Sequence, residues 1–379
     1  MLILAAILAI FVYGLIAAML GTLLPELSTR FALTPGQNGD IALAQAIGLI
    51  IASVAVGPLI DIKGKKTGLL LGLGLIAISL FVVPSAPAAG LGPVFLALGV
   101  GGGIIVTAAN ALVSDISESR RASTLNLLNL FFGLGGLVTP LIGGSILEGN
   151  TIALCYLVAV LTVLTFVLHV ATPMPRPTGE RGFKMSEVGP VLGRPVLFLL
   201  ALLLFLYVTC EVGVWNWLPR HLVALGIPQS RALKILSLGF ALGLLVGRVA
   251  VSRILIRVSS PVVTLGASIL MAVTTYAMLQ TRDAFLAGVL VFCAGLAMAP
   301  VFPTTLAMVG DAFPRMTATA MGVVITCGWI GLAISSRIIG AIAGNDASQL
   351  KTALLVIPIA SVLMVFVTLA VRPMLARKV

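Results

Sequence analysis

The stretch GPLIDIKGKKTGLLLG, from Gly57 to Gly72, places four charged residues between two long apolar runs. The chain around it has 379 residues, of which 60% are hydrophobic and only 9% are charged, whereas soluble domains carry about 25% charged residues. A water-soluble fold of this length would not cover its surface with so few charges, so lipid must be the solvent for most of that surface. The quoted stretch is therefore expected to form a short polar turn between two membrane-crossing segments.

Twelve runs of the chain are long and apolar enough to cross a membrane, because a helix needs about 20 mainly apolar residues to span the hydrocarbon layer. The expected spans are 3–24, 38–60, 67–85, 90–113, 123–147, 151–171, 195–218, 232–255, 261–280, 285–309, 317–342 and 352–371. Their hydrophobicity is continuous rather than alternating, which indicates helices and excludes a membrane β-barrel. The predicted fold class is an all-α membrane protein with twelve transmembrane helices.

The least hydrophobic segment, residues 172–195, is rich in Pro, Gly and basic residues and separates the first six spans from the last six. It predicts two six-helix bundles, residues 1–171 and 196–379, joined by a cytoplasmic linker. A shift of 196 residues aligns Asp115 with Asp311, and several glycines follow at the same offset. This repeat predicts bundles related by a pseudo-two-fold axis along the membrane normal, with a solute site midway between them.

The basic residues predict the orientation of the chain. With the N-terminus inside, 15 of the 23 Lys and Arg residues fall on the cytoplasmic side and six fall outside. The positive-inside rule therefore predicts a multi-pass protein of the inner (cytoplasmic) membrane with both termini in the cytoplasm. The same rule accounts for the net charge of +11 without a nucleic-acid partner. The four cysteines lie within spans and form no CxxC pair, so we expect no metal and no other cofactor.

The charged turn has the pattern G-x-x-x-D-x-x-G-x-K, with Gly57, Asp61, Gly64 and Lys66 at the fixed positions. The pattern resembles the signature loop between the second and third helices of the major facilitator superfamily, a family of transporters. The number of spans and the mid-chain linker resemble that family as well. Glycines at these positions are expected to allow a tight turn and the close approach of another helix.

The resemblance implies that Asp61 meets the N-terminus of the span 317–342 and holds the cytoplasmic side shut while the outer side is open. A carboxylate near a helix N-terminus is stabilised by about 0.3–1 kcal/mol. Arg120 or Arg121 is expected to orient Asp61 through a forked pair of hydrogen bonds. With the four motif residues, these two arginines form the predicted cytoplasmic gate.

Polar side chains inside the spans are candidate solute-binding groups, because they are costly to bury in a bilayer. Amides offer both a donor and an acceptor to hydroxyl groups, and tryptophan rings stack on the C–H faces of sugars, so these groups suit a polyhydroxylated ring. The alternatives are amide hydrogen bonds that join helices and an aromatic belt at the membrane interface. The candidate substrate-binding residues are Asn110, Asn126, Asn129, Glu211, Trp215, Asn216 and Trp329.

Glu211 is the acidic residue placed deepest within a predicted span. Carboxyl groups inside membranes commonly relay protons, so Glu211 is the candidate proton carrier. The alternative is a structural ion pair between Glu211 and Arg337, and both residues are kept as candidates for proton coupling.

Three stretches, TAAN at 107–110, LNLLNLFFGLGG at 125–136 and EVGVWNWLP at 211–219, resemble the fucose/galactose/glucose–proton symporter branch of the superfamily. The resemblance implies uptake of a monosaccharide by alternating access, coupled to protons. The chain departs from that branch in having no acid in the span 3–24 before Glu26 and Val106 four residues before Asn110. Sodium coupling and facilitated diffusion therefore stay open.

The rival within transport is a drug–proton antiporter, because GGLVTPLIGG at 135–144 is close to an antiporter pattern. The span 90–113 lacks the buried arginine that such antiporters carry, which favours sugar transport. A membrane receptor would need a soluble signalling domain, for which the twelve spans leave no room. His169 and His221 are far apart in the sequence, so no catalytic group is indicated and the protein is not expected to be an enzyme. The expected partners are a small-molecule substrate and the lipid bilayer, with the chain a monomer.

Overall fold

The computed structural model describes residues 2–33, 35–147, 150–175, 188–228, 231–232, 235–343 and 349–376. These residues are helical almost throughout, and no strand occurs among them. Twelve helical segments are long and apolar enough to cross a membrane, which confirms the predicted fold class. Of the predicted linker at 172–195, residues 176–187 lie outside the described part of the chain.

The helices group into two compact units by their contacts. Unit 1 comprises 1–117, 128–190 and 313–326, and unit 2 comprises 118–127, 191–312 and 327–379. Each unit therefore takes a short segment from the opposite half of the chain. The first turns of α5 belong to unit 2, and the N-terminal part of α14 belongs to unit 1.

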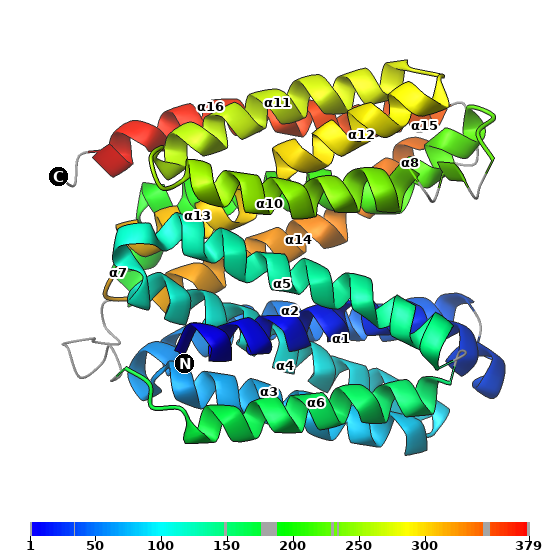
Figure 1. Cartoon of the computed structure of the whole chain (residues 1–379), viewed down its shortest axis with the longest axis vertical. Helices are drawn as coiled ribbons and strands as arrows, with labels where there is room; N and C mark the ends of the chain where they lie inside the picture. Colours follow the sequence, from blue (N-terminus) through cyan, green and yellow to red (C-terminus); the bar gives the residue numbers. More distant parts are fainter. Residues whose placement is uncertain are drawn as a thin grey trace. The chain divides into compact units, whose positions relative to one another are not determined.

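In unit 1, the helix α4 is the central element (Figure 1). It packs against α1, α2 and α3, and every residue from Gly101 to Ser114 is buried. α6 covers α3 and α1 from the outside. The elements of the first half of the chain are α1 (Leu2–Phe31), α2 (Pro35–Lys63), α3 (Lys65–Val82), η1 (Val83–Ser85), α4 (Ala88–Ile116), η2 (Glu118–Arg120), α5 (Arg121–Leu141), η3 (Ile142–Ile146), α6 (Thr151–Ala171) and α7 (Val188–Leu192).

In unit 2, α16 packs between α8 and α11, and α12 packs against α10, α11 and η6. The expected span at 285–309 is divided into α12 and α13 near Pro300, where proline removes a backbone donor. The segment η6 is a π-helix that leads directly into α10. The elements of the second half are α8 (Pro195–Ala224), η6 (Ile235–Ala241), α10 (Leu242–Ile254), α11 (Ser260–Gln280), α12 (Ala284–Met298), α13 (Val301–Ala312), α14 (Thr317–Ala343), α15 (Leu350–Leu354) and α16 (Val356–Ala376).

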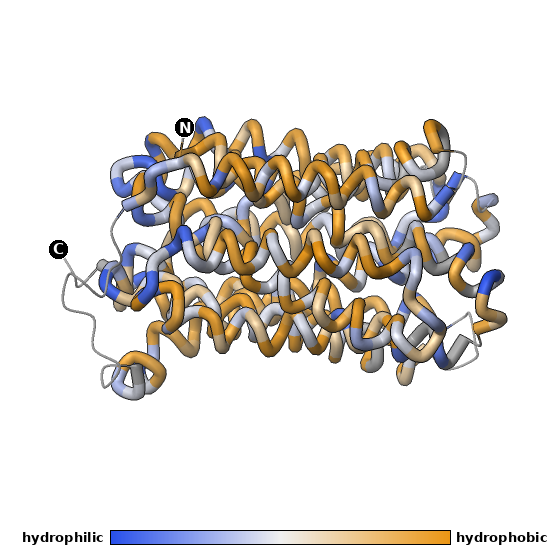
Figure 2. Tube along the Cα trace, turned by 90° about the horizontal axis from the view of Figure 1, so that it is seen from below, coloured by the Kyte–Doolittle hydropathy of each residue, from blue (hydrophilic) through white to orange (hydrophobic). Residues whose placement is uncertain are grey.

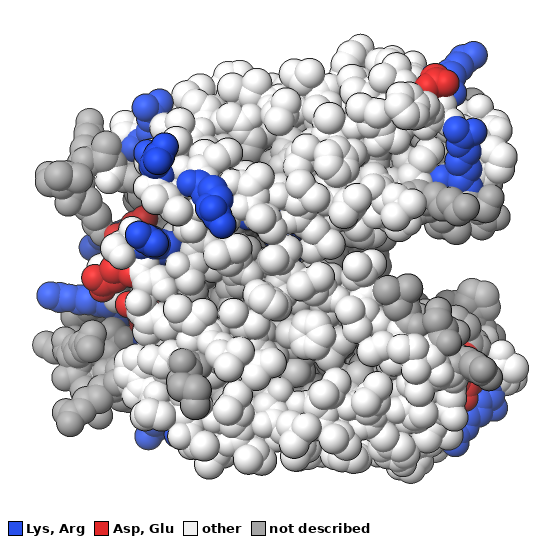
Figure 3. Space-filling view, viewed as in Figure 1, with Lys and Arg blue, Asp and Glu red and all other residues white. Residues whose placement is uncertain are grey.

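The outer surfaces of the helices are apolar, as expected of surfaces that face lipid. Side chains as large as Phe198, Phe285 and Phe366 are more than 60% exposed, and hydrophilic residues concentrate towards the helix ends in Figure 2. On the face drawn in Figure 3, charged side chains likewise lie towards the helix ends, with an uncharged band between them. The chain is a multi-pass membrane protein.

Candidate functional site

The first cluster, here called the latch, joins the end of α2 to the start of α14 within unit 1. The Asp61 carboxylate is fully buried and accepts hydrogen bonds from the backbone N–H groups of Ala318 (3.3 Å) and Thr319 (2.8 Å) and from the Thr319 hydroxyl (2.8 Å). The first backbone N–H groups of a helix have no partner within the helix. Asp61 therefore caps α14 from a different helix, where its negative charge also meets the positive end of the helix dipole.

Lys65 supplies the positive charge beside Asp61. Its ammonium lies 3.8 Å from the Asp61 carboxylate and 2.8 Å from that of Asp115, at the end of α4, and its side chain is only 5% exposed. Arg120 or Arg121 was predicted for this role, but the structure places Lys65 beside Asp61, and Arg121 pairs with Asp311. Lysine at the first position of α3 reaches Asp61 because residues four apart lie on one helical face, and Gly64 interrupts the helix there by only one residue.

Glycine is required at the two glycine positions of the motif for different structural reasons. Gly64 has φ +95°, a backbone conformation that residues with a Cβ rarely adopt. At Gly57, a Cβ would lie 2.7 Å from the Cα of Thr319 and 2.8 Å from the carbonyl oxygen of Ala318. Only glycine therefore lets α2 approach the N-terminus of α14 closely enough for Asp61 to cap it.

Lys66 lies outside the latch. Its ammonium donates to the carbonyl oxygens of Val170 (2.7 Å) and Thr172 (3.1 Å) at the end of α6. A cation at a helix C-terminus satisfies carbonyl groups that have no partner within the helix and interacts favourably with the helix dipole. Lys66 thus anchors α6 to α3, whereas its neighbour Lys65 serves the latch.

Arg121 forms an ion pair with Asp311, at the end of α13 in unit 2. Two residues later, the Ser123 hydroxyl donates to the carbonyl oxygen of Ser252 in α10 (2.7 Å). Asp115 and Asp311 correspond to each other under the shift of 196 residues. Each therefore pairs with a cation of its own unit: Asp115 with Lys65 in unit 1, and Asp311 with Arg121 in unit 2. The N-terminal turns of α5 are tied to unit 2 by these contacts.

The three candidate asparagines have different surroundings. The Asn129 amide donates to the Asn110 side-chain oxygen (3.0 Å), and Asn110 donates to the carbonyl oxygen of Val106 (2.7 Å), so this pair joins α4 to α5. Asn126 is fully buried, and neither its amide nitrogen nor its amide oxygen has a hydrogen-bond partner among the described residues. Buried polar groups are nearly always satisfied. Asn126 therefore has unused hydrogen-bonding capacity for a solute or water.

The second cluster, here called the Glu211 cluster, lies in unit 2 and consists of Tyr207, Glu211, Trp215 and Arg248. Arg248 of α10 faces the Glu211 carboxylate electrostatically, the Trp215 indole N–H donates to that carboxylate, and the Tyr207 hydroxyl lies beside it. The Tyr207 hydroxyl itself makes no hydrogen bond among the described residues. Arg248 is 5% exposed and Tyr207 is fully buried. The cluster thus holds opposite charges and aromatic rings inside a membrane-spanning unit.

Among the described residues, the cation that faces Glu211 is Arg248, whereas the alternative expected from the sequence was an ion pair with Arg337. The side chain of Arg337 lies outside the described residues. Trp215 contributes in a second way, because its ring packs edge-on against Phe240 of η6, with centroids 5.3 Å apart. Trp215 is 38% exposed and Asn216 is also exposed, whereas Trp329 is half-buried.

The family follows from comparison with known proteins. The family model described as Major Facilitator Superfamily matches residues 6–336. The chain belongs to the major facilitator superfamily. It is 22% identical to "Bypass of stop codon protein 6" of Saccharomyces cerevisiae, over 92% of this chain and 78% of the yeast protein. The fold predicted from the charged turn and the twelve spans is therefore that of this family of transporters.

Solved structures of the superfamily share this fold. The transporter FucP in its outward conformation superimposes with a TM-score of 0.86, covering 97% of this chain and 98% of FucP at 18% sequence identity. The proton:xylose symporter XylE superimposes with a TM-score of 0.78, covering 96% of this chain and 94% of XylE at 16% identity. At these identities the likeness describes the fold of the major facilitator superfamily.

Proposed function

We propose that this superfamily member transports a small polar solute, a monosaccharide, by alternating access and in symport with protons. The observation that carries the proposal is the Glu211 cluster, in which a carboxylate, a guanidinium and an aromatic ring meet inside the bilayer. Polar groups at such depth are costly unless they serve a function. The crystallised proton symporters for fucose and xylose that share this fold support the choice of solute.

The groups available for a solute suit a neutral ring with several hydroxyls. The buried Asn126 amide has two unused hydrogen-bonding groups, each able to bind a hydroxyl. Trp215 presents an indole ring that is 38% exposed and held in place by Phe240. The charges of Glu211 and Arg248 face each other, so the cluster adds little net charge that would require an ionic solute.

The same cluster gives a physical basis for proton coupling. Protonating Glu211 would remove the carboxylate charge that faces Arg248, and a buried guanidinium left without a counter-charge is costly. That cost falls if solute hydroxyls or a rearranged helix provide new partners for the guanidinium. Proton binding at Glu211 and solute binding beside it would then stabilise each other, which is the requirement for symport.

The latch supplies the conformational part of the proposal. Asp61 holds the N-terminus of α14 against α2, and this contact must break for the helices to separate at that end. The positive-inside bias supports a cytoplasmic location for this end. In the proposed cycle, the latch closes the cytoplasmic entrance during solute loading and opens for solute release.

A binding experiment tests the proposal. The purified protein is screened for thermal stabilisation by hexoses, pentoses and cationic drugs, because a ligand that binds the folded state raises its Tm. Proton uptake is then measured with a pH electrode when the best sugar is added. We expect a sugar to raise the Tm and to draw protons into the wild-type protein, with no proton uptake in Glu211→Gln. Glu118→Gln, at an exposed residue, is the matched control. Stabilisation by cationic drugs alone would indicate the antiporter instead, and proton uptake by Glu211→Gln would remove Glu211 from the mechanism.

A further inference from the structure

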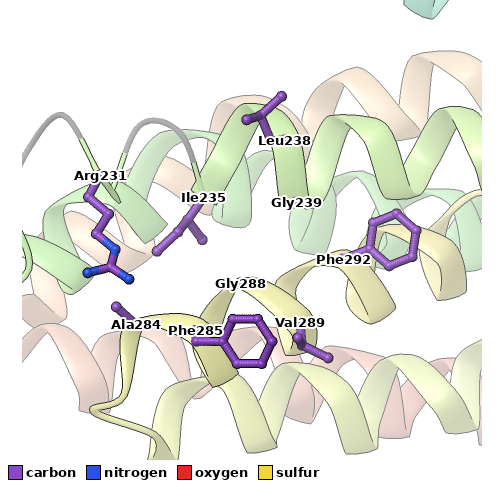
Figure 4. Close-up of a pocket in the computed structure, with 9 residues that line it drawn as sticks. All are labelled: Arg231, Ile235, Leu238, Gly239, Ala284, Phe285, Gly288, Val289 and Phe292. Atoms are coloured by element: carbon purple, nitrogen blue, oxygen red, sulfur yellow. The ribbon is translucent and has the colours of Figure 1, made fainter.

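A cavity lies in unit 2 between η6 and α12, and its lining shares no residue with the Glu211 cluster. Its volume is about 460 Å³, within the range of about 300–1,000 Å³ typical of small-molecule sites. Figure 4 shows Arg231 at one end, close to Ile235 and Ala284, and Phe292 at the other. The residues that line it are Arg231, Ile235, Leu238, Gly239, Ala284, Phe285, Gly288, Val289 and Phe292. We call this cavity the η6–α12 slot.

The slot opens on the apolar surface of the unit. Phe285 is 76% exposed and Leu238 is 67% exposed, and both elements belong to membrane spans. Large apolar side chains exposed along a membrane span face acyl chains. The slot is therefore accessible from the hydrocarbon layer, and its apolar walls suit an extended hydrocarbon chain.

Arg231 places a positive charge at one end of the otherwise apolar slot. Among the described residues, it is the one ionisable side chain that lines the slot, and no described carboxylate pairs with it. The carboxylate of Asp283, beside the lining residue Ala284, is engaged with the backbone N–H of Leu286 (2.7 Å) as the cap of α12. An exposed guanidinium next to an apolar slot is complementary to a phosphate, which it binds with two parallel hydrogen bonds.

Glycine keeps the slot open. A Cβ at Gly288 would have Ile235 Cγ1 at 4.0 Å as its nearest neighbour, so there is free space above this residue. At Gly239, a Cβ would come within 3.2 Å of Val291 and 3.3 Å of the Gly288 carbonyl oxygen. The π-helical turn at η6 carries Ile235, Leu238 and Gly239 along this wall, and π-helical turns are frequent at functional sites.

We propose that the η6–α12 slot binds an anionic phospholipid, with its phosphate on Arg231 and an acyl chain between η6 and α12. The charge at the mouth selects the headgroup, and the apolar walls select a lipid over a free anion. On its other side, η6 carries Phe240, which packs against Trp215. The bound lipid is therefore separated from the Glu211 cluster by the η6 segment.

The test compares two lipids that differ only in headgroup charge. Phosphatidylglycerol and phosphatidylcholine with identical acyl chains are added to the purified protein in mixed micelles, and the apparent affinity is taken from the rise in Tm with lipid fraction. We expect phosphatidylglycerol to bind the wild-type protein more tightly and Arg231→Gln to weaken that binding about tenfold, since a hydrogen bond to a charged group is lost. Arg257→Gln, at an exposed arginine beyond the C-terminal end of α10, should leave the affinity unchanged.

A second pair of variants tests the slot itself. Gly288→Leu fills the slot and should abolish lipid stabilisation, whereas Gly266→Leu, on the open face of α11, should not. Equal affinity for the two lipids, retention of phosphatidylglycerol binding by Arg231→Gln or by Gly288→Leu, or the same rise in Tm with inorganic phosphate would each overturn the proposal.

Discussion

Replacing Asp61 by asparagine removes the charge from the latch while leaving the side chain almost the same size. The wild-type carboxylate accepts three hydrogen bonds, two from Thr319 and one from Ala318. An asparagine oxygen can keep the two bonds from Thr319. Its NH₂ group would then face the backbone N–H of Ala318, donor against donor, and Lys65 would lose one of its two carboxylates.

The magnitude follows from these contacts. A hydrogen bond to a charged group contributes about 1.5–3 kcal/mol, and the substitution removes at least one such bond together with the charge. Since each 1.4 kcal/mol changes an equilibrium about tenfold, the equilibrium between closed and open latch should shift about 10- to 150-fold towards open.

Amide hydrogen exchange measures this equilibrium directly, because two of the hydrogen bonds to Asp61 come from backbone N–H groups. In a peptide covering 313–326, the amides of Ala318 and Thr319 should exchange about 10- to 150-fold faster in Asp61→Asn. Asp40→Asn, at an exposed position of the same helix α2, is the matched control and should leave these amides unchanged. Unaltered exchange of the two amides in Asp61→Asn would refute the capping role of Asp61.

Four further substitutions follow from the structure. Gly57→Ala should speed the exchange of the same two amides through a steric clash rather than through a change of charge. An exchange rate equal to that of the wild-type protein would show that α2 and α14 lie further apart than the 2.7 Å between an added Cβ and the Cα of Thr319 implies. Lys65→Gln should lower the free energy of unfolding by about 3 kcal/mol, since it leaves Asp61 without its buried cation; a loss below about 1 kcal/mol in a denaturant titration would contradict this. Asn126→Leu should raise the Tm of the solute-free protein, because it removes an unsatisfied buried amide, and should weaken solute binding; a lower Tm would mean that the amide has a partner. Burial and the charge of Lys351 lower the pKa of His221, so the unfolded chain binds this proton more tightly, and stability should fall as the pH drops below about 6.5. His221→Gln should flatten the dependence of Tm on pH between about 7 and 5, and an unchanged slope would exclude His221 as its source.

The fold was predictable because it depends on quantities that are local in the sequence. Hydrophobic length defines each span, and the pattern around Asp61 places charges and glycines at fixed positions. Gly57 and Gly64 were identified correctly for this reason, since the backbone conformation and the close approach that they permit leave glycine as the fitting residue.

The partners within the sites were less predictable, because they depend on which helices face each other. Nothing local indicates that Lys65, rather than Arg121, reaches Asp61, or that Arg248 faces Glu211. The spacing of Asn126 and Asn129 correctly suggested a shared helix face, yet Asn129 is hydrogen-bonded to another amide and Asn126 is not. The one available signal was Arg248 itself, a charged residue inside a predicted span.

Solute accumulation by the reconstituted protein distinguishes proton symport from facilitated diffusion. Proteoliposomes are loaded at pH 7.5 and diluted into buffer at pH 6.0, and uptake of a radiolabelled sugar that raises the Tm is followed with and without a protonophore. We expect accumulation above equilibrium that the protonophore abolishes, and equilibration without accumulation in Glu211→Gln. Accumulation by Glu211→Gln equal to that of the wild-type protein, or no sugar movement through the wild-type protein, would contradict the account.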